Sequence, residues 1–200
     1  MKVFRIALIG GALAAIAALA ATSRTTAEES GGAYTQTAVF AGGCFWCVES
    51  DFEKLDGIGD VVSGYTGGAM QNPTYRNHGG HVEAARIPFD PNVISYRELV
   101  DYFFRHIDPL DDGGQFCDRG HSYTTAIFYD GDDQKADAEA AKAAAEEALG
   151  KSVVTPIQAL DQFWDAEGYH QDYYKKNPVR YNFYRNGCGR DRRVKQVWGK

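Results

Sequence analysis

Apolar residues near position 40 change from a strand-like to a helical spacing. The run TAVFAGG, residues 37–43, is short, apolar and ended by glycines, which is typical of a buried strand. From Phe45 to Leu55 the apolar residues recur every three to four positions with polar residues between them, which predicts a helix with one buried face. The order strand, Gly-Gly, helix places Cys44 at the N-terminus of that helix.

The rest of the chain predicts further strands and helices. Ser95 with Glu98 three residues later is a capping box, which starts a predicted helix over 95–107. An Ala-rich helix is expected at 132–150, where Gly150 ends it. Strands are expected at 60–68, 81–91, 123–130 and 153–160, a loop at 108–120, an aromatic helical segment at 163–178 and an irregular tail beyond it. We therefore expect an α+β fold, a two-layer α/β sandwich with a mixed central sheet.

The first residues have the composition of a targeting segment. Lys2 and Arg5 precede an uncharged apolar stretch that ends near the small-residue step Ala18-Leu19-Ala20. This arrangement is typical of a secretory signal peptide, so we expect a signal at 1–20, a flexible segment at 21–37 and one catalytic domain at 38–200. The expected location is the periplasm or the outside of the cell, with no stable membrane insertion after signal removal. An uncleaved membrane anchor is the alternative.

Charge and cysteine content narrow the classes of function. The net charge of −6 argues against binding to nucleic acid and to anionic membranes. The four cysteines are Cys44, Cys47, Cys117 and Cys188. A secreted binding module stapled by two disulfides is one interpretation. A domain of this length does not need such staples, which favours a chemical role for at least some of the thiols.

Cys44 is the candidate nucleophile. At a helix N-terminus the macrodipole and the free N–H groups stabilise a thiolate, so we expect a lowered pKa. Cys47 lies one helical turn away, within reach of a disulfide. A C-x-x-C pair at a helix start is also the motif of thioredoxin-like dithiol-disulfide oxidoreductases, which remain an alternative. No metal is expected, because Cys117 and Cys188 lie far from each other and from any close histidine in the sequence.

Seven short motifs then occur in a specific order between Ala38 and Tyr184: GGCFWCVE, GYTGG, NPTYR, GHVEA, DPNVISY, IDPLDDGGQFCDRGHSY and EGYHQDYYKKNP. Together they closely resemble the peptide-methionine (S)-S-oxide reductases, the A-type methionine sulfoxide reductases. The resemblance implies a ferredoxin-like core and reduction of the S-epimer of methionine sulfoxide, free or in proteins. It also implies no cofactor, a thioredoxin-like dithiol donor as partner, and a monomer.

The resemblance assigns the nucleophile and the substrate pocket. Cys44 is implied to attack the sulfoxide sulfur as a thiolate, which leaves a sulfenic acid and methionine. Phe45 and Trp46 are implied to form the apolar wall that holds the methyl group, and His170 has a supporting role in substrate binding. This explains why two aromatic residues separate the cysteines.

The sulfoxide oxygen requires a proton and hydrogen-bond donors. By the resemblance, Glu83 is the acid, Tyr75 and Tyr123 bind the oxygen, and Asp118 orients the donors. A carboxylic acid keeps its proton near neutral pH only when it is buried, and Glu83 lies among apolar residues of a predicted strand.

The resolving thiol is not settled by the resemblance, because many members carry glycine at the position of Cys47 and the position of Cys117 varies. We expect Cys47 to attack the sulfenic acid first, since it lies one turn away. Cys188, between two glycines of the tail, is expected to act as a second acceptor that carries the disulfide outward. Cys117 is expected to be a buried neighbour of the site.

Overall fold

Six strands form one mixed sheet in the order β7-β6-β1-β3-β2-β8, and β4 pairs with β5 in a separate ribbon. The computed structural model describes residues 34–199 together with Met1, so the predicted signal peptide and most of the predicted flexible segment lie outside the described residues. The strands are β1 Gln36–Gly42, β2 Val62–Thr66, β3 Val82–Phe89, β4 Gly114–Gln115, β5 Asp118–Arg119, β6 Thr125–Tyr129, β7 Ile157–Ala159 and β8 Phe163–Asp165. The helices are α1 Phe45–Phe52, α2 Tyr96–Phe104, α3 Asp132–Leu149, α4 Tyr173–Lys176, α5 Pro178–Cys188 and α6 Arg190–Trp198, with a short 3-10 helix at His121–Tyr123.

The central part of the sheet has the ferredoxin-like order. β1, α1, β2, β3, α2 and β6 succeed one another along the chain, and the strands lie as β6-β1-β3-β2 with every neighbouring pair antiparallel. β7 joins one edge parallel to β6, and β8 joins the other edge antiparallel to β2. The predicted α+β sandwich with a mixed sheet and a ferredoxin-like core is confirmed.

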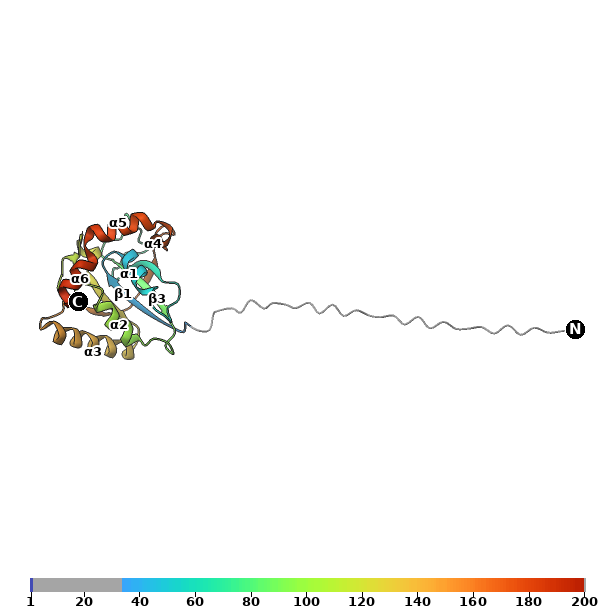
Figure 1. Ribbon diagram of the computed structural model, residues 1–200, viewed down its shortest axis with the longest axis horizontal. Helices are drawn as coiled ribbons and strands as arrows, with labels where there is room; N and C mark the ends of the chain where they lie inside the picture. Colours follow the sequence, from blue (N-terminus) through green and yellow to red (C-terminus); the bar gives the residue numbers. More distant parts are fainter. Residues whose placement is uncertain (2–33, 200) are drawn as a thin grey trace. The chain divides into compact units, whose positions relative to one another are not determined.

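One face of the sheet carries the main hydrophobic core. Successive residues of a strand point to opposite faces, so Phe40 and Ala38 of β1 share this face. Phe40 stacks on Phe103 of α2 with ring centroids 4.9 Å apart, and Val48 of α1 and Ala141 of α3 belong to the same buried cluster. Figure 1 shows α2 and α3 side by side. The helices α1, α2 and α3 therefore cover this face of the sheet and form the second layer of the sandwich.

The opposite face is covered by the connection between β7 and β8. These strands lie at opposite edges of the sheet, yet only residues 160–162 separate them along the chain. Such a connection reaches at most about 14 Å, so the sheet is curled and its two edges approach each other across this face. Thr66 Oγ1 donates a hydrogen bond to the Gln162 carbonyl at 2.7 Å, which fixes the crossing segment to β2. A Cβ atom on Gly64 would lie 2.3 Å from the carbonyl oxygen of Trp164, so β2 and β8 approach closely only because this residue is glycine.

Two predictions for the C-terminal part are wrong. The segment 163–178 begins with β8, because its first residues pair with β2, and only α4 near its end is helical. The tail expected to be irregular forms α5 and α6 (Figure 1). Its second helix is held by Arg190, which is buried and donates hydrogen bonds to the carbonyls of Gly42 at 3.1 Å and His106 at 3.0 Å.

Smaller differences concern element boundaries. β1 begins at Gln36, so it includes two residues that we assigned to the N-terminal segment. The strand expected at 153–160 is reduced to β7, which begins after Pro156, a residue that has no N–H for a ladder. The expected loop at 108–120 contains the β4–β5 ribbon. None of the helices within the described residues is long and apolar enough to cross a membrane.

Candidate active site

Cys44 lies where β1 turns into α1. Gly43 makes the turn with φ +82°, a conformation that favours glycine, and a Cβ there would lie 2.6 Å from the Gln115 side chain. Cys44 is the N-cap residue of α1, and its carbonyl accepts the first backbone bond, from Cys47 N–H at 3.0 Å. The predicted strand, Gly-Gly, helix arrangement is therefore present, and it presents a thiol at the end of the central strand.

Cys44 opens into a cavity of about 60 Å³. Its lining is Cys44, Phe45, Trp46, Tyr75, Glu83, Asp118, Tyr123 and Tyr184. Seven of these residues are the ones that the motifs single out, and they come from five separate segments of the chain. The structure thus brings together the predicted nucleophile, apolar wall, acid and oxygen-binding residues in one small pocket.

Glu83 has the properties of a proton donor at neutral pH. It lies on β3 opposite Tyr65 of β2, and its side chain is 1% exposed. Burial raises the pKa of Glu83 to about 8, although a hydrogen bond from the Phe45 backbone N–H at 3.0 Å opposes this shift. Glu83 is therefore mostly protonated below pH 8, as an acid that delivers a proton to an oxygen must be.

The expected lowering of the Cys44 pKa is wrong. Burial raises the pKa of Cys44 well above its usual value, and this outweighs the helix N-terminus because the thiol is only 6% exposed. A hydrogen bond from Cys44 instead lowers the pKa of Cys47 to about 7, and the nearby positive charges of Arg190 and Arg185 act in the same direction. Of the two thiols, Cys47 is therefore the one that ionises at the lower pH, with Cys44 as its hydrogen-bond donor.

Tyr75 and Tyr123 line the same pocket as Cys44. Burial raises the pKa of both hydroxyls, so each remains a neutral donor. The two tyrosines also hydrogen-bond to each other, which raises the pKa of Tyr123 and lowers that of Tyr75. Their hydroxyls therefore lie next to each other in the pocket. Such a pair of neutral donors is suited to bind a polar oxygen.

Tyr184 of α5 is a pocket residue that the motifs did not indicate. Its hydroxyl donates a hydrogen bond to Asp118 Oδ2. The same hydroxyl can donate to the Cys44 sulfur instead, which lowers the pKa of that thiol. Tyr181, Tyr184 and Cys188 are spaced i, i+3 and i+7, so a helical interpretation of the tail would have placed all three on one face. Asp118 is thus present in the site, with Tyr184 between it and the nucleophile.

His170 lies behind the pocket and does not line it. It is buried, and its Nδ1 accepts a hydrogen bond from Trp46 Nε1 at 3.1 Å. Its ring also packs against Phe45 with centroids 5.0 Å apart. Trp46 is stacked on Tyr173 of α4 at 3.8 Å. His170 therefore positions the apolar wall that we expected it to assist.

The other two cysteines form a disulfide. Cys117 is bonded to Cys188 across 71 positions of sequence, which ties the β4–β5 ribbon to the end of α5. Cys44 and Cys47 are free and buried. Cys117 is exposed, so our expectation of a buried neighbour of the site is wrong. Its partner Cys188 is distant in the sequence and comes close only because α5 docks against the ribbon.

Among the residues that the structure describes, two clusters of acidic residues or cysteines lie close enough together to hold a metal ion, but their possible ligand atoms already have partners. Glu49, Glu53 and Asp172 lie together, yet Glu49 accepts hydrogen bonds from Ser63 Oγ at 2.9 Å and from the Asp172 N–H at 2.6 Å. Lys175 pairs with Glu53 at 2.5 Å. In the other cluster the two sulfurs of Cys117 and Cys188 are joined to each other.

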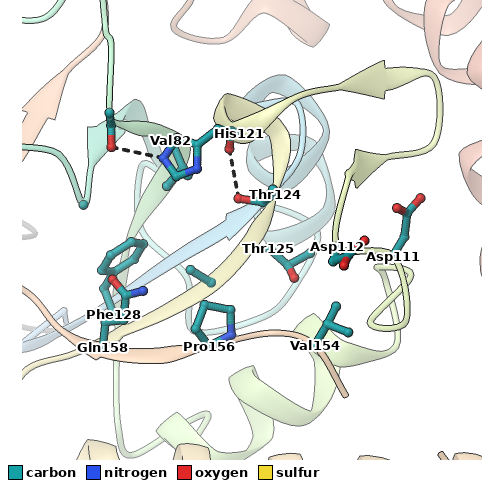
Figure 2. Close-up of a pocket in the computed structure, with 13 residues that line it drawn as sticks. Val82, Asp111, Asp112, His121, Thr124, Thr125, Phe128, Val154, Pro156 and Gln158 are labelled. Atoms are coloured by element: carbon teal, nitrogen blue, oxygen red, sulfur yellow. Dashed lines mark hydrogen bonds between the residues drawn. The ribbon is translucent and has the colours of Figure 1, made fainter. Parts of the chain in front are cut away.

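A larger cavity of about 290 Å³ lies on the sheet face that is opposite the main core (Figure 2). Two of its polar side chains are already paired, since His121 Nε2 contacts the Gly80 carbonyl at 3.1 Å and Asp111 binds Arg119 at 2.6 Å. None of the four cysteines lines it. The pocket at Cys44 therefore remains the candidate active site.

Comparison with known proteins gives a consistent result. The family model described as peptide methionine sulfoxide reductase matches residues 36–200. A relative from Rhizobium meliloti named peptide methionine sulfoxide reductase MsrA 2 is 55% identical over 166 residues, which cover 82% of this chain and 84% of that protein.

Two solved structures of yeast Mxr1 from Saccharomyces cerevisiae are similar to this fold. The reduced form has a TM-score of 0.68 at 31% identity and covers 72% of this chain and 86% of that chain. The complex with Trx2 has a TM-score of 0.50 at 25% identity, over 69% of this chain and 84% of that chain. With the family model matching the whole described domain, the chain belongs to the peptide methionine sulfoxide reductases.

Proposed function

We propose that this protein reduces the S-epimer of methionine sulfoxide, free and within proteins, to methionine. One observation carries the proposal: a thiol and a protonated buried carboxyl, Cys44 and Glu83, share a small pocket with an apolar wall. The methyl group lies against Phe45 and Trp46, and the oxygen lies toward Tyr75 and Tyr123. Since these two contacts and the direction of attack are fixed, the pocket accepts only one configuration at sulfur.

The first step forms a sulfenic acid. Cys47 takes the proton of Cys44, which then attacks the sulfoxide sulfur as a thiolate. The S=O bond breaks, the oxygen passes to Cys44 with a proton from Glu83, and methionine leaves. The sulfoxide gains two electrons and the Cys44 sulfur loses two. The pKa of about 7 at Cys47 suits it to accept this proton near neutral pH.

The second step forms a disulfide between Cys44 and Cys47. Cys47 attacks the Cys44 sulfenic sulfur, and the hydroxyl leaves with a proton as water. Cys47 is the free thiol that contacts Cys44, whereas Cys188 is already bonded to Cys117. This arrangement supports Cys47 as the first resolving residue. The expected role of Cys188 as second acceptor requires prior reduction of its own disulfide.

The disulfide is then reduced by an external dithiol donor of the thioredoxin type, with no cofactor. The similar fold of the yeast protein bound to Trx2 supports this class of donor. We infer a monomer that is exported to the periplasm or beyond. A disulfide near the surface, Cys117–Cys188, is typical of proteins in oxidising compartments and supports export together with the basic, apolar N-terminus.

Separate S- and R-epimers of N-acetyl-methionine sulfoxide, offered with dithiothreitol, test the activity. We expect turnover of the S-epimer alone and none in the Cys44→Ser variant, because a hydroxyl cannot replace the soft nucleophile. Equal rates on both epimers, or normal turnover in that variant, would refute the proposal. Reduction of insulin disulfides in place of the sulfoxide would favour a dithiol-disulfide oxidoreductase. N-terminal mass spectrometry of the protein from its native cells tests export, which predicts a mature chain that starts near Ala21 or Glu28.

A further inference from the structure

A second cavity adjoins the active pocket and shares two of its walls. It has a volume of about 440 Å³ and is lined by Trp46, Tyr173, Val179, Arg180, Phe183 and Tyr184. Trp46 and Tyr184 line both cavities, so the two cavities are neighbours. The groove therefore borders the place where the sulfoxide is reduced.

The outer side of the groove presents unpartnered apolar side chains. Val179 and Phe183 of α5 are each 82% exposed. They are spaced i and i+4, so they lie on the same side of the helix. Single exposed apolar residues are ordinary on protein surfaces, but these two border an aromatic wall and form a continuous apolar patch with it.

The aromatic wall is held rigidly by its neighbours. Trp46 is stacked on Tyr173 with an interplanar angle of 9°, and the edge of Tyr184 meets Trp46 at 6.0 Å and 84°. His170 fixes the indole ring by accepting a hydrogen bond from its N–H at 3.1 Å. A groove whose aromatic side chains are already ordered loses little entropy when an apolar group binds to it.

We propose that this groove binds apolar side chains of a polypeptide next to its oxidised methionine, so the preferred substrates are exposed apolar segments of oxidised proteins. The inference rests on the proposed function. The pocket of about 60 Å³ holds only the sulfoxide end of a side chain, so the substrate backbone remains outside it. Neighbouring residues of an extended chain follow at about 3.3–3.6 Å each, which brings their side chains over the groove.

Steady-state kinetics of two variants and a matched control tests the proposal. Phe183→Ala and Val179→Ala remove the exposed apolar groups, while Asn182→Ala changes an exposed residue of α5 that does not line the groove. The substrates are two short peptides with S-methionine sulfoxide flanked by Leu and Phe or by Ser and Gly, and N-acetyl-methionine sulfoxide. We expect KM for the apolar peptide to rise about tenfold in Phe183→Ala, with kcat and the other two substrates unchanged.

Binding to the inactive Cys44→Ser protein gives a second readout that does not depend on turnover. Calorimetry should show tighter binding of the apolar peptide than of the polar one, and the Phe183→Ala change should abolish the difference. Equal binding of both peptides, or an unchanged KM in both groove variants, would overturn the proposal. A raised KM for the thioredoxin-like donor with unchanged peptide KM would assign the groove to the donor and also overturn it. If the wild type did not reduce the S-epimer specifically, the proposed function would be refuted. The groove proposal would still be tested, because peptide binding to the Cys44→Ser protein is measured separately.

Discussion

The Glu83 carboxyl group accepts a hydrogen bond from the backbone N–H of Phe45 at 3.0 Å. Phe45 follows the nucleophile directly, so the acid on β3 and the first turn of α1 are joined without an intermediate. The bond leaves one carboxyl oxygen for a proton and the substrate. It thus fixes the position of the acid relative to Cys44 before any substrate binds.

Replacing Glu83 with glutamine should slow sulfenic acid formation by roughly 10²–10⁴-fold at pH 7, because the amide keeps the shape but has no acidic proton. Burial raises the pKa of Glu83 to about 8, so the wild-type group is protonated below pH 8 and loses its proton above it. The wild-type rate should therefore fall as the pH rises through about 8, and this fall should be missing in Glu83→Gln. Single-turnover kinetics between pH 6 and pH 10 measures both; an unchanged rate in the variant would remove Glu83 from the mechanism.

Cys47→Ser should accumulate the Cys44 sulfenic acid after one equivalent of substrate, since the contacting thiol is lost. Cys188→Ser should still form the Cys44–Cys47 disulfide at the wild-type rate, because Cys188 is bonded to Cys117 in the folded protein. Mass spectrometry of trapped thiols and disulfides distinguishes the two variants. The order is wrong if Cys47→Ser forms Cys44–Cys188 at full rate while Cys188→Ser accumulates sulfenic acid.

Tyr184→Phe should raise the pKa of Cys44 further, because the Tyr184 hydroxyl hydrogen-bonds that thiol and lowers its pKa. Alkylation of Cys44 by iodoacetamide, followed as a function of pH, should shift to higher pH. We expect sulfoxide reduction at pH 7 to fall about tenfold, the effect of one hydrogen bond to a charged group. Phe183→Ala, on the same helix and outside the active pocket, is the control; an equal shift in both variants would point to a general disturbance of α5.

Arg190→Ala should destabilise the protein. Arg190 and Asp51 are both 3% exposed at the side chain and lie 3.6 Å apart, so the change leaves a buried carboxylate with less compensation. We expect the free energy of unfolding to fall by about 3 kcal/mol, near the lower limit for breaking a buried pair, because Arg185 still binds Asp51 at 2.9 Å. Urea denaturation measures this, with the exposed Arg192→Ala as control; equal stability of the two variants would contradict it.

The sequence alone predicts the first part of the domain well, because its signals are local. The two glycines before Cys44, the capping box at Ser95 and the alternation along β3 each act within a few residues. The motif residues of the pocket are likewise identified one by one, from Phe45 to Tyr123, and the structure places them together.

The features that the sequence does not predict depend on partners far along the chain. α6 is polar, and its buried Arg190 donates hydrogen bonds to carbonyls of residues 84 and 148 positions away. The Cys117–Cys188 bond belongs to one of the three ways in which four cysteines can form two pairs, and it is decided by the docking of α5. The raised pKa of Cys44 likewise follows from burial under tertiary contacts, which a local dipole argument does not include.

The packing of α5 over the thiol pair has a consequence for how the enzyme is made. Tyr181 of α5 packs against Cys44 and Cys47, and the Cys117–Cys188 bond fastens the end of this helix. A ribosome produces the reactive thiols early and the residues that shield them last. If the protein is exported as proposed, an incompletely folded chain would carry an unprotected dithiol into an oxidising environment until the final segment closes over it.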